Sequence, residues 1–208
     1  DNIGFGGSDQ PADLDYRYPT HYRYIEGFID ALELDNIIFV IHDWGSALGL
    51  DYAARHPDRV RGVVMMEAIV PPTMPAESYD AMRPQLGEFF RTMRNPEIGP
   101  KMMIEDNYFV EGVLPGFTVR PLGEAEMTVY RAPFLDMAKR VAINQWPNEI
   151  PIGGEPADVV EIVDNYVAWM YRTDMPMLFL YAHPGALNPP AAVDWLAARV
   201  SNMETSYI

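Results

Sequence analysis

The sequence predicts an α/β protein in which a mostly parallel sheet, flanked by helices, carries a helical insertion. Apolar runs at 36–42 and 61–70 enclose a helical pattern at 46–60, which is the order of a strand–helix–strand unit. This alternation stops between residues 73 and 155 and resumes after residue 156. With 208 residues, the chain is long enough for one such core and an insertion.

The first core segment, residues 1–72, contains a glycine-rich loop followed by two helices and two strands. Apolar side chains recur at helical spacing within 20–34. The run NIIFVIH is continuously apolar, as is typical of a parallel strand covered on both faces. The next helix should end before Pro57. Because strand–helix–strand units form right-handed crossovers, the two strands should be parallel.

The remaining residues divide into an insertion and a second core segment. The insertion, residues 73–155, shows helical patterns at 88–93, 99–114 and 122–135 and no convincing strand. In the second core segment, residues 156–208, a helix at 157–173 and a strand at 175–185 precede a helix at 189–200. A last apolar run occupies 204–208.

Composition and charge exclude several classes of function. Fifteen basic against thirty acidic residues give a net charge of −15, which disfavours nucleic acids and anionic membranes as partners. No apolar run reaches membrane-spanning length, so we expect a soluble protein, cytoplasmic with a periplasmic location left open. The absence of cysteine excludes disulfides and a thiol nucleophile. No histidine pair has metal-ligand spacing, and the oligomeric state is left open.

An acid, Asp43, stands where the first buried strand meets a helix. A strand, a reactive residue, a glycine two positions later and a helix form the order of a nucleophile elbow, with Asp43 and Gly45 in these places. The helix N-terminus should keep the carboxylate ionised. An ionised, desolvated carboxylate can attack an sp3 carbon and form an ester. The indole N–H of Trp44 suits a departing halide, which accepts hydrogen bonds.

At these residues the sequence resembles the haloalkane dehalogenases of the α/β-hydrolase superfamily. The resemblance covers the whole chain through DNIGFGGSDQP, VIHDWGSALG, MMEAI, YRAPF, WPNEIPIGGEP and HPGALNPP. Epoxide hydrolases share the elbow HDWG, whereas Glu67 at the end of the next strand is more specific. The resemblance implies an α/β-hydrolase fold whose insertion, 73–155, is a helical cap over an apolar tunnel. It implies no metal and no cofactor.

The resemblance also implies the reaction and the site. In the subfamily with an Asp–His–Glu triad, Asp43 is the nucleophile, Trp44 a halide ligand, and Glu67 the acid that orients the catalytic histidine. The reaction converts a haloalkane and water to an alcohol and a halide through an alkyl–aspartate ester. The tunnel would be lined by Phe90, Phe109, Val113, Phe117, Ile150, Ala186 and Leu187.

Two parts of the family pattern are absent from these 208 residues. They are the early strands with the loop that carries the second halide ligand, and the catalytic histidine, which the family places beyond Ile208. We therefore expect an internal piece of a longer enzyme. Among the four histidines, His21 and His56 fall at expected helix ends, and His42 points away from the elbow. Only His183 follows a strand on the same rim.

Alternatives remain open at each residue. Asp43 suits a helix N-cap, Trp44 suits core packing, Glu67 suits a buried salt bridge, and part of the aromatic set suits packing within the cap. An epoxide hydrolase would share the elbow and would use tyrosines to protonate the epoxide oxygen; the candidates are Tyr79, Tyr108 and Tyr130. Trp44 and Glu67 favour the halide reaction. A catalytically silent fragment that lacks the base is the alternative outside enzymes.

Overall fold

The computed structural model describes all 208 residues, which form two compact units. One unit contains residues 25–82 and 151–208 and holds the sheet; the other contains residues 1–24 and 83–150 and is helical. Helix α1 (Tyr18–Ala31) runs across the division between them.

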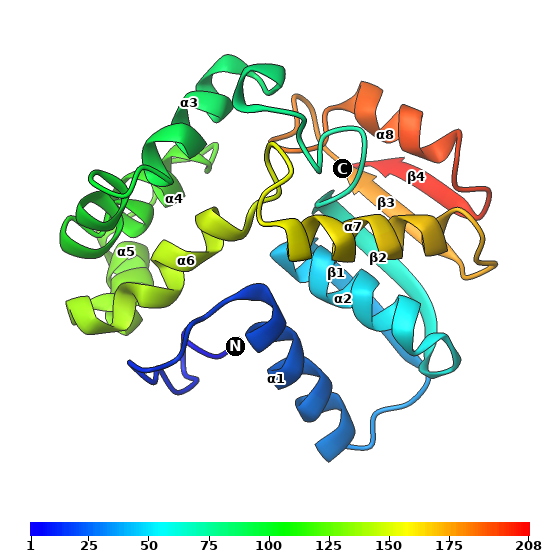
Figure 1. Cartoon of the computed structure of the whole chain (residues 1–208), viewed down its shortest axis with the longest axis horizontal. Coiled ribbons are helices and arrows are strands. Elements are labelled where there is room, and N and C mark those ends of the chain that lie inside the picture. Colours follow the sequence, from blue (N-terminus) through cyan, green and yellow to red (C-terminus); the bar gives the residue numbers. More distant parts are fainter. The chain divides into compact units, whose positions relative to one another are not determined.

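The sheet has four parallel strands in the order β1-β2-β3-β4 (Figure 1). They are β1 (Ile37–Asp43), β2 (Val60–Ala68), β3 (Met177–Tyr181) and β4 (Met203–Tyr207). All four coincide with apolar runs identified in the sequence, so the α/β fold class and the parallel pairing of the first two strands are confirmed. The helical insertion separates β2 from β3 in the chain, yet the two strands are neighbours in the sheet.

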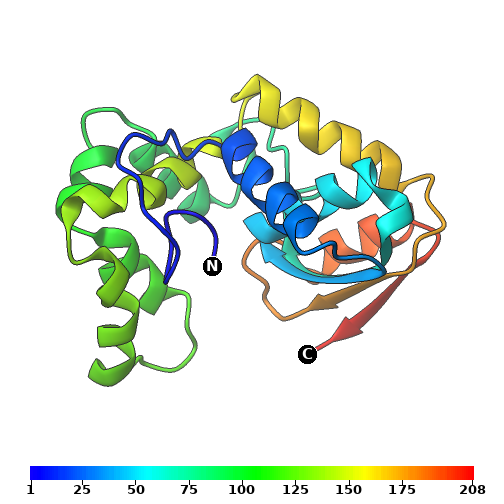
Figure 2. The same ribbon diagram turned by 90° about the horizontal axis from the view of Figure 1, so that it is seen from below.

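Three helices and short helical turns accompany the sheet. Helix α2 (Trp44–Arg55) contacts β1, β2 and helix α7 (Ala157–Met170), and helix α8 (Pro190–Ala197) contacts β3 and β4 (Figure 2). The short 3-10 turns η1 (Pro57–Arg59) and η2 (Tyr79–Ala81) lie in the connecting segments. The core between sheet and helices contains fully buried side chains from both layers: Leu50, Tyr52, Met65, Tyr166, Phe179 and Leu196.

Strand β1 departs from the expectation of a strand covered on both faces. Phe39 and Ile41 point toward α2, where a Cβ on Gly49 would lie 2.9 Å from the Ile41 side chain. Ile38 and Val40 alternate with them and are 65% and 68% exposed. A strand alternates its side chains between two faces, and α2 covers only one face of this edge strand. The apolar run therefore identified the strand correctly but not its environment.

The helical unit contains no strand among its residues. Its elements after α1 are α3 (Pro84–Met93), η3 (Lys101–Glu105), η4 (Phe109–Val113), α4 (Leu114–Gly116), α5 (Glu124–Arg131), η5 (Ala132–Phe134), η6 (Met137–Arg140) and α6 (Val141–Glu149). Residues 99–114 were expected to form one helix, and they instead form two π-helical turns separated at Asn107, which has a φ of 51°. Helix α6 was not anticipated because it contains Pro147, which usually signals a helix end.

A buried arginine and a buried glutamate organise this unit. The Arg140 guanidinium donates hydrogen bonds to four backbone carbonyls, those of Ile104, Glu105, Phe134 and Leu135. The Glu149 carboxylate, 1% exposed, accepts from the Tyr18 amide and from Arg17. These contacts join segments of the unit that are distant in the sequence. No helix of the chain is long and apolar enough to cross a bilayer.

Candidate active site

Asp43 is the last residue of β1 and lies in the tight turn into α2. Its φ of 48° and ψ of −127° place a non-glycine residue in a sparsely populated backbone region. Its side chain makes no capping hydrogen bond to α2, so the carboxylate is not used as an N-cap. A strained turn whose carboxylate does not cap the following helix is the geometry expected of a nucleophile elbow.

Ser46, which sequence reasoning did not single out, ties this turn to the next strand. Its buried hydroxyl donates to the Asp43 carbonyl oxygen at 2.5 Å and accepts from the Ile69 amide at 2.9 Å. The glycine that packing requires is Gly49 rather than Gly45, because a Cβ at Gly45 would meet nothing within 4 Å. The only sequence signal for the role of Ser46 was that a small polar residue stands in the first turn of the helix.

The electrostatic environment of Asp43 differs from the expectation. Burial raises the pKa of the Asp43 carboxyl, and the nearby charge of Glu67 raises it further. His42 and the Trp44 amide, at the N-terminus of α2, act in the opposite direction and lower this pKa. The helix N-terminus thus favours the anion as predicted, but burial outweighs it. Asp43 consequently ionises at a higher pH than an ordinary aspartate.

Glu67 lies near the end of β2, the strand next to β1, at the same edge of the sheet as Asp43. His42 pairs with Met66 and Asp43 pairs with Ala68, which leaves Glu67 as the extra residue of a bulge. Its φ of 43° is a second positive value for a non-glycine residue. The expected placement of the two acids at the carboxyl ends of neighbouring parallel strands is therefore confirmed. The negative charge of Glu67 contributes to the raised pKa of the Asp43 carboxyl, although less than burial does.

The Glu67 carboxylate is held by backbone amides instead of the salt bridge that was one alternative. Oε1 accepts from the Ala186 amide at 2.8 Å, and Oε2 accepts from the Leu187 and Asn188 amides at 2.5 and 3.0 Å. These donors follow β3, more than a hundred residues later in the chain. Ala186 and Leu187 were expected to line a tunnel; what the structure shows is that their backbone amides hold the Glu67 carboxylate. No sequence pattern pointed to this contact.

Trp44 and three of the four histidines belong to the same unit as the two acids. Trp44 begins α2 and is 8% exposed. His42 and His183 are exposed, and His56 contacts the Glu26 carboxylate at 2.9 Å. His183 lies in the loop after β3, as expected, at the edge where the acids lie.

The fourth histidine, His21, is a core residue of the helical unit. Its ring stacks on Trp146 with centroids 4.3 Å apart, and burial lowers its pKa to about 4. Such a histidine stays neutral at physiological pH and packs against aromatic rings. Nowhere does the structure gather three histidine, aspartate or glutamate side chains in a metal-binding arrangement.

The proposed tunnel residues differ in exposure and in the unit to which they belong. Phe90 and Ile150 are buried in the helical unit, Val113 is half-buried, and Phe109 and Phe117 are 37% and 61% exposed. Ala186 and Leu187 belong to the sheet unit and are half-buried.

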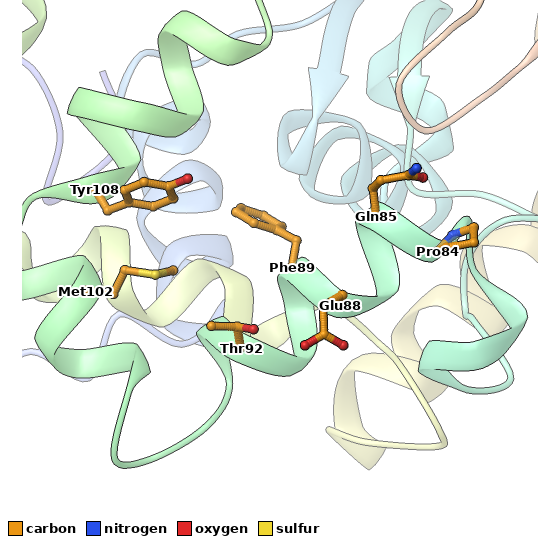
Figure 3. A pocket seen from close by; sticks show the side chains of 7 residues that line it. All are labelled: Pro84, Gln85, Glu88, Phe89, Thr92, Met102 and Tyr108. Atoms are coloured by element: carbon orange, nitrogen blue, oxygen red, sulfur yellow. The ribbon is translucent and has the colours of Figure 1, made fainter.

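Two hollows lie on the helical unit. The first, of about 490 Å³, contains none of the tunnel candidates, and Figure 3 shows its lining residues: Pro84, Gln85, Glu88, Phe89, Thr92, Met102 and Tyr108. Phe117 lines the second hollow, of about 310 Å³, beside Phe89. Helix α3 therefore lines both hollows, which sequence reasoning did not anticipate.

Comparison with known proteins agrees with this geometry. The alpha/beta hydrolase fold family matches residues 1–105. A haloalkane dehalogenase of Sphingobium indicum is 45% identical over 194 residues, which cover 90% of this chain and 64% of the relative. A haloalkane dehalogenase of Mesorhizobium japonicum is 41% identical, with 97% and 64% of the two chains covered. The chain thus spans just under two thirds of the length of these curated relatives.

Solved structures extend the likeness to the whole chain. The crystal structure of the haloalkane dehalogenase DbeA from Bradyrhizobium elkani matches all of this chain and 70% of its own, with 36% identity and a TM-score of 0.95. That of DatA from Agrobacterium tumefaciens matches all of this chain and 69% of its own, with 32% identity and a TM-score of 0.90. The chain therefore belongs to the alpha/beta hydrolase fold family, and within it to the haloalkane dehalogenases.

Proposed function

We propose that this protein hydrolyses haloalkanes to an alcohol and a halide ion. The observation that carries the proposal is the Asp43 carboxylate, which does not cap α2 and lies in a strained turn beside Glu67 on the neighbouring strand. Its haloalkane dehalogenase relatives support the same chemistry. Accordingly, we assign haloalkanes, halide ion and water as the reaction partners.

In the first step, the ionised carboxylate of Asp43 attacks the halogen-bearing carbon in line with the carbon–halogen bond. A carbon–oxygen bond forms, and the halogen leaves with the electron pair as halide. Trp44 donates its indole N–H to the halide as negative charge develops on it. Because burial raises the pKa of the Asp43 carboxyl, the nucleophile ionises at a higher pH than an ordinary aspartate does.

In the second step, a histidine base removes a proton from water, and the hydroxide attacks the ester carbonyl carbon at Asp43. Collapse of the tetrahedral intermediate releases the alcohol and restores the carboxylate. We assign Glu67 the role of accepting a hydrogen bond from the histidine ring and so fixing its tautomer. His21 and His56 are unsuitable as the base, because His21 is packed in the other unit's core and His56 is paired with Glu26.

We further propose that residues 73–155 form the cap and that 1–72 and 156–208 form the hydrolase core. Phe90, Phe109, Val113, Phe117, Ile150, Ala186 and Leu187 are the proposed tunnel residues. Among them, the exposed Phe109 and Phe117 are those most open to a substrate in the helical unit. The reaction as proposed needs no cofactor, since the nucleophile, the acid and the halide donor are all side chains.

The test is halide release by the protein as its gene encodes it, with chloro-, bromo- and iodoalkanes of different chain lengths. We expect turnover by the parent and its loss in Asp43→Asn, because an amide cannot act as the nucleophile. Asp13→Asn, at an exposed aspartate, is the matched control and should retain activity.

Mass spectrometry of a rapidly quenched reaction should find the alkyl group on Asp43. Failure of the parent to release halide from any haloalkane would contradict the proposal. Turnover of an epoxide without turnover of any haloalkane would replace it with epoxide hydrolysis.

A further inference from the structure

We propose that Asn188 is a positioning residue for Glu67. By anchoring its own loop to the segment that follows β2, it holds three consecutive amides on the Glu67 carboxylate. The inference rests on the proposed role of Glu67 as the acid that orients the catalytic histidine. Nothing in the sequence patterns or in the family resemblance assigned a role to Asn188.

The first observation is that Glu67 occupies a strained position of the backbone. Glu67 is the unpaired residue of the bulge, and its φ is 43°. A glutamate in this conformation is strained and persists only where surrounding contacts determine it. The position of its carboxylate must therefore come from what the carboxylate binds.

The second observation is the pattern of donors on the two carboxylate oxygens. Oε2 accepts the Leu187 and Asn188 amides, whereas Oε1 accepts only the Ala186 amide. A carboxylate has about four lone-pair sites, so this pattern leaves one site on Oε1 for a further donor. We assign that site to a ring N–H of the catalytic histidine. The three amides thus select which oxygen can face the histidine.

The third observation is how the loop that carries these amides is fixed. The Asn188 side chain is 2% exposed, and its Nδ2 donates to Thr73 Oγ1 at 3.1 Å. The Thr73 hydroxyl in turn donates to the Val70 carbonyl at 3.1 Å. Asn188 therefore links the loop after β3 to the segment after β2, which is the strand that carries Glu67.

The loop itself turns tightly at Gly185. Its φ is +71°, and a Cβ there would lie 2.6 Å from the Asn188 carbonyl oxygen. Only glycine fits this turn, which brings the three amides to one side of the loop. Gly185 sets the shape of the loop, whereas the Asn188–Thr73 hydrogen bond sets its place.

The side chain of Asn188 is better suited to positioning than to stability. Its Oδ1 is buried without a hydrogen-bond partner in the structure. A buried polar atom of this kind costs free energy, so replacing Asn188 with leucine removes that cost together with the bond to Thr73. We expect Asn188→Leu to change the unfolding midpoint little while loosening the loop.

The catalytic consequence is specific to one of the two steps. Alkylation of Asp43 needs the nucleophile and the halide donor, whereas ester hydrolysis also needs the histidine oriented by Glu67. Displacement of a catalytic group by about 1 Å can slow a step by about a hundredfold. Loss of the Asn188 anchor should therefore slow ester hydrolysis by about tenfold to a hundredfold and leave alkylation within about twofold.

The experiment is rapid-quench kinetics of the whole gene product with a bromoalkane, comparing the parent with Asn188→Leu and Thr73→Val. Each variant should give a normal first equivalent of bromide, slow later turnover and accumulation of the alkyl–Asp43 ester. The double variant should be no slower than the slower single variant, because both remove the same hydrogen bond. Thr73→Ser, which keeps the hydroxyl, should restore ester hydrolysis. Asn165→Leu, at an exposed asparagine, is the control.

A second readout does not depend on activity. Hydrogen exchange of the amides at 186–188 should be slow in the parent and faster in Asn188→Leu and Thr73→Val. Unchanged exchange, or equal slowing of alkylation and hydrolysis, would overturn the positioning role. If the parent releases no halide, the proposed function fails, and amide exchange alone then decides whether Asn188 holds the amides on Glu67.

Discussion

Ser46→Ala tests the connection between the nucleophile turn and the neighbouring strand. The Ser46 hydroxyl bridges the Asp43 carbonyl and the Ile69 amide, and it is fully buried. Alanine has a slightly higher helix propensity than serine, which would stabilise α2 by at most about 0.5 kcal/mol. The substitution therefore isolates the two hydrogen bonds of the hydroxyl.

The magnitude follows from what the substitution leaves behind. The Ile69 amide loses its partner in a residue with no exposed surface. Leaving one buried polar group unpaired costs about 1–3 kcal/mol. The Asp43 carbonyl also loses its 2.5 Å contact, and a net hydrogen bond contributes about 1 kcal/mol. We expect the free energy of unfolding to fall by about 2–4 kcal/mol.

The assay is urea unfolding of the whole gene product followed by tryptophan fluorescence, with the rate constant of Asp43 alkylation measured in parallel. Alkylation should slow because the strained turn at Asp43 loses a contact that maintains it. Ser206→Ala, at an exposed position of β4, is the control and should change stability by less than about 0.5 kcal/mol. A loss below about 1 kcal/mol for Ser46→Ala would refute the reasoning.

Three other predictions concern the acid, the cap and the base. Asp43→Asn should be more stable than the parent at neutral pH, because burial raises the pKa of the Asp43 carboxyl. In urea titrations at a series of pH values, this gain in the free energy of unfolding should vanish below the ordinary aspartate pKa of 3.8 and grow above it. Tryptophan at Phe109 or Val113 should shift preference among haloalkane chain lengths more than the unfolding midpoint, since these side chains are not fully buried; equal losses for all substrates would indicate ordinary packing. If the gene encodes residues after Ile208, a variant that ends at Ile208 should release one equivalent of halide and stop with alkylated Asp43, as seen by mass spectrometry. Sustained release would identify another base, with His183 the first to test.

Local sequence patterns predicted much of the sheet unit correctly. The apolar runs identified all four strands, and the helical patterns between them identified α2, α7 and α8. Asp43 and Glu67 were recognisable because each interrupts or ends an apolar run, and strand ends at one edge of a parallel sheet lie close together. Periodicity failed at α6, where Pro147 contradicts the helical pattern, and at 99–114, where positive φ at Asn107 divides the helix.

The sequence by itself determined the order of strands and helices and the placement of two acids at neighbouring strand ends, because these depend on periodicity within short segments. Only the tertiary structure decided how the acids are held. The bulge at Glu67, its three amide donors and the Ser46 bridge all arise where segments distant in the chain meet. The raised pKa of Asp43 likewise depends on burial and on the charge of Glu67. Side-chain periodicity indicates which face of an element is apolar, but it carries no information about which distant backbone groups will bind a given carboxylate.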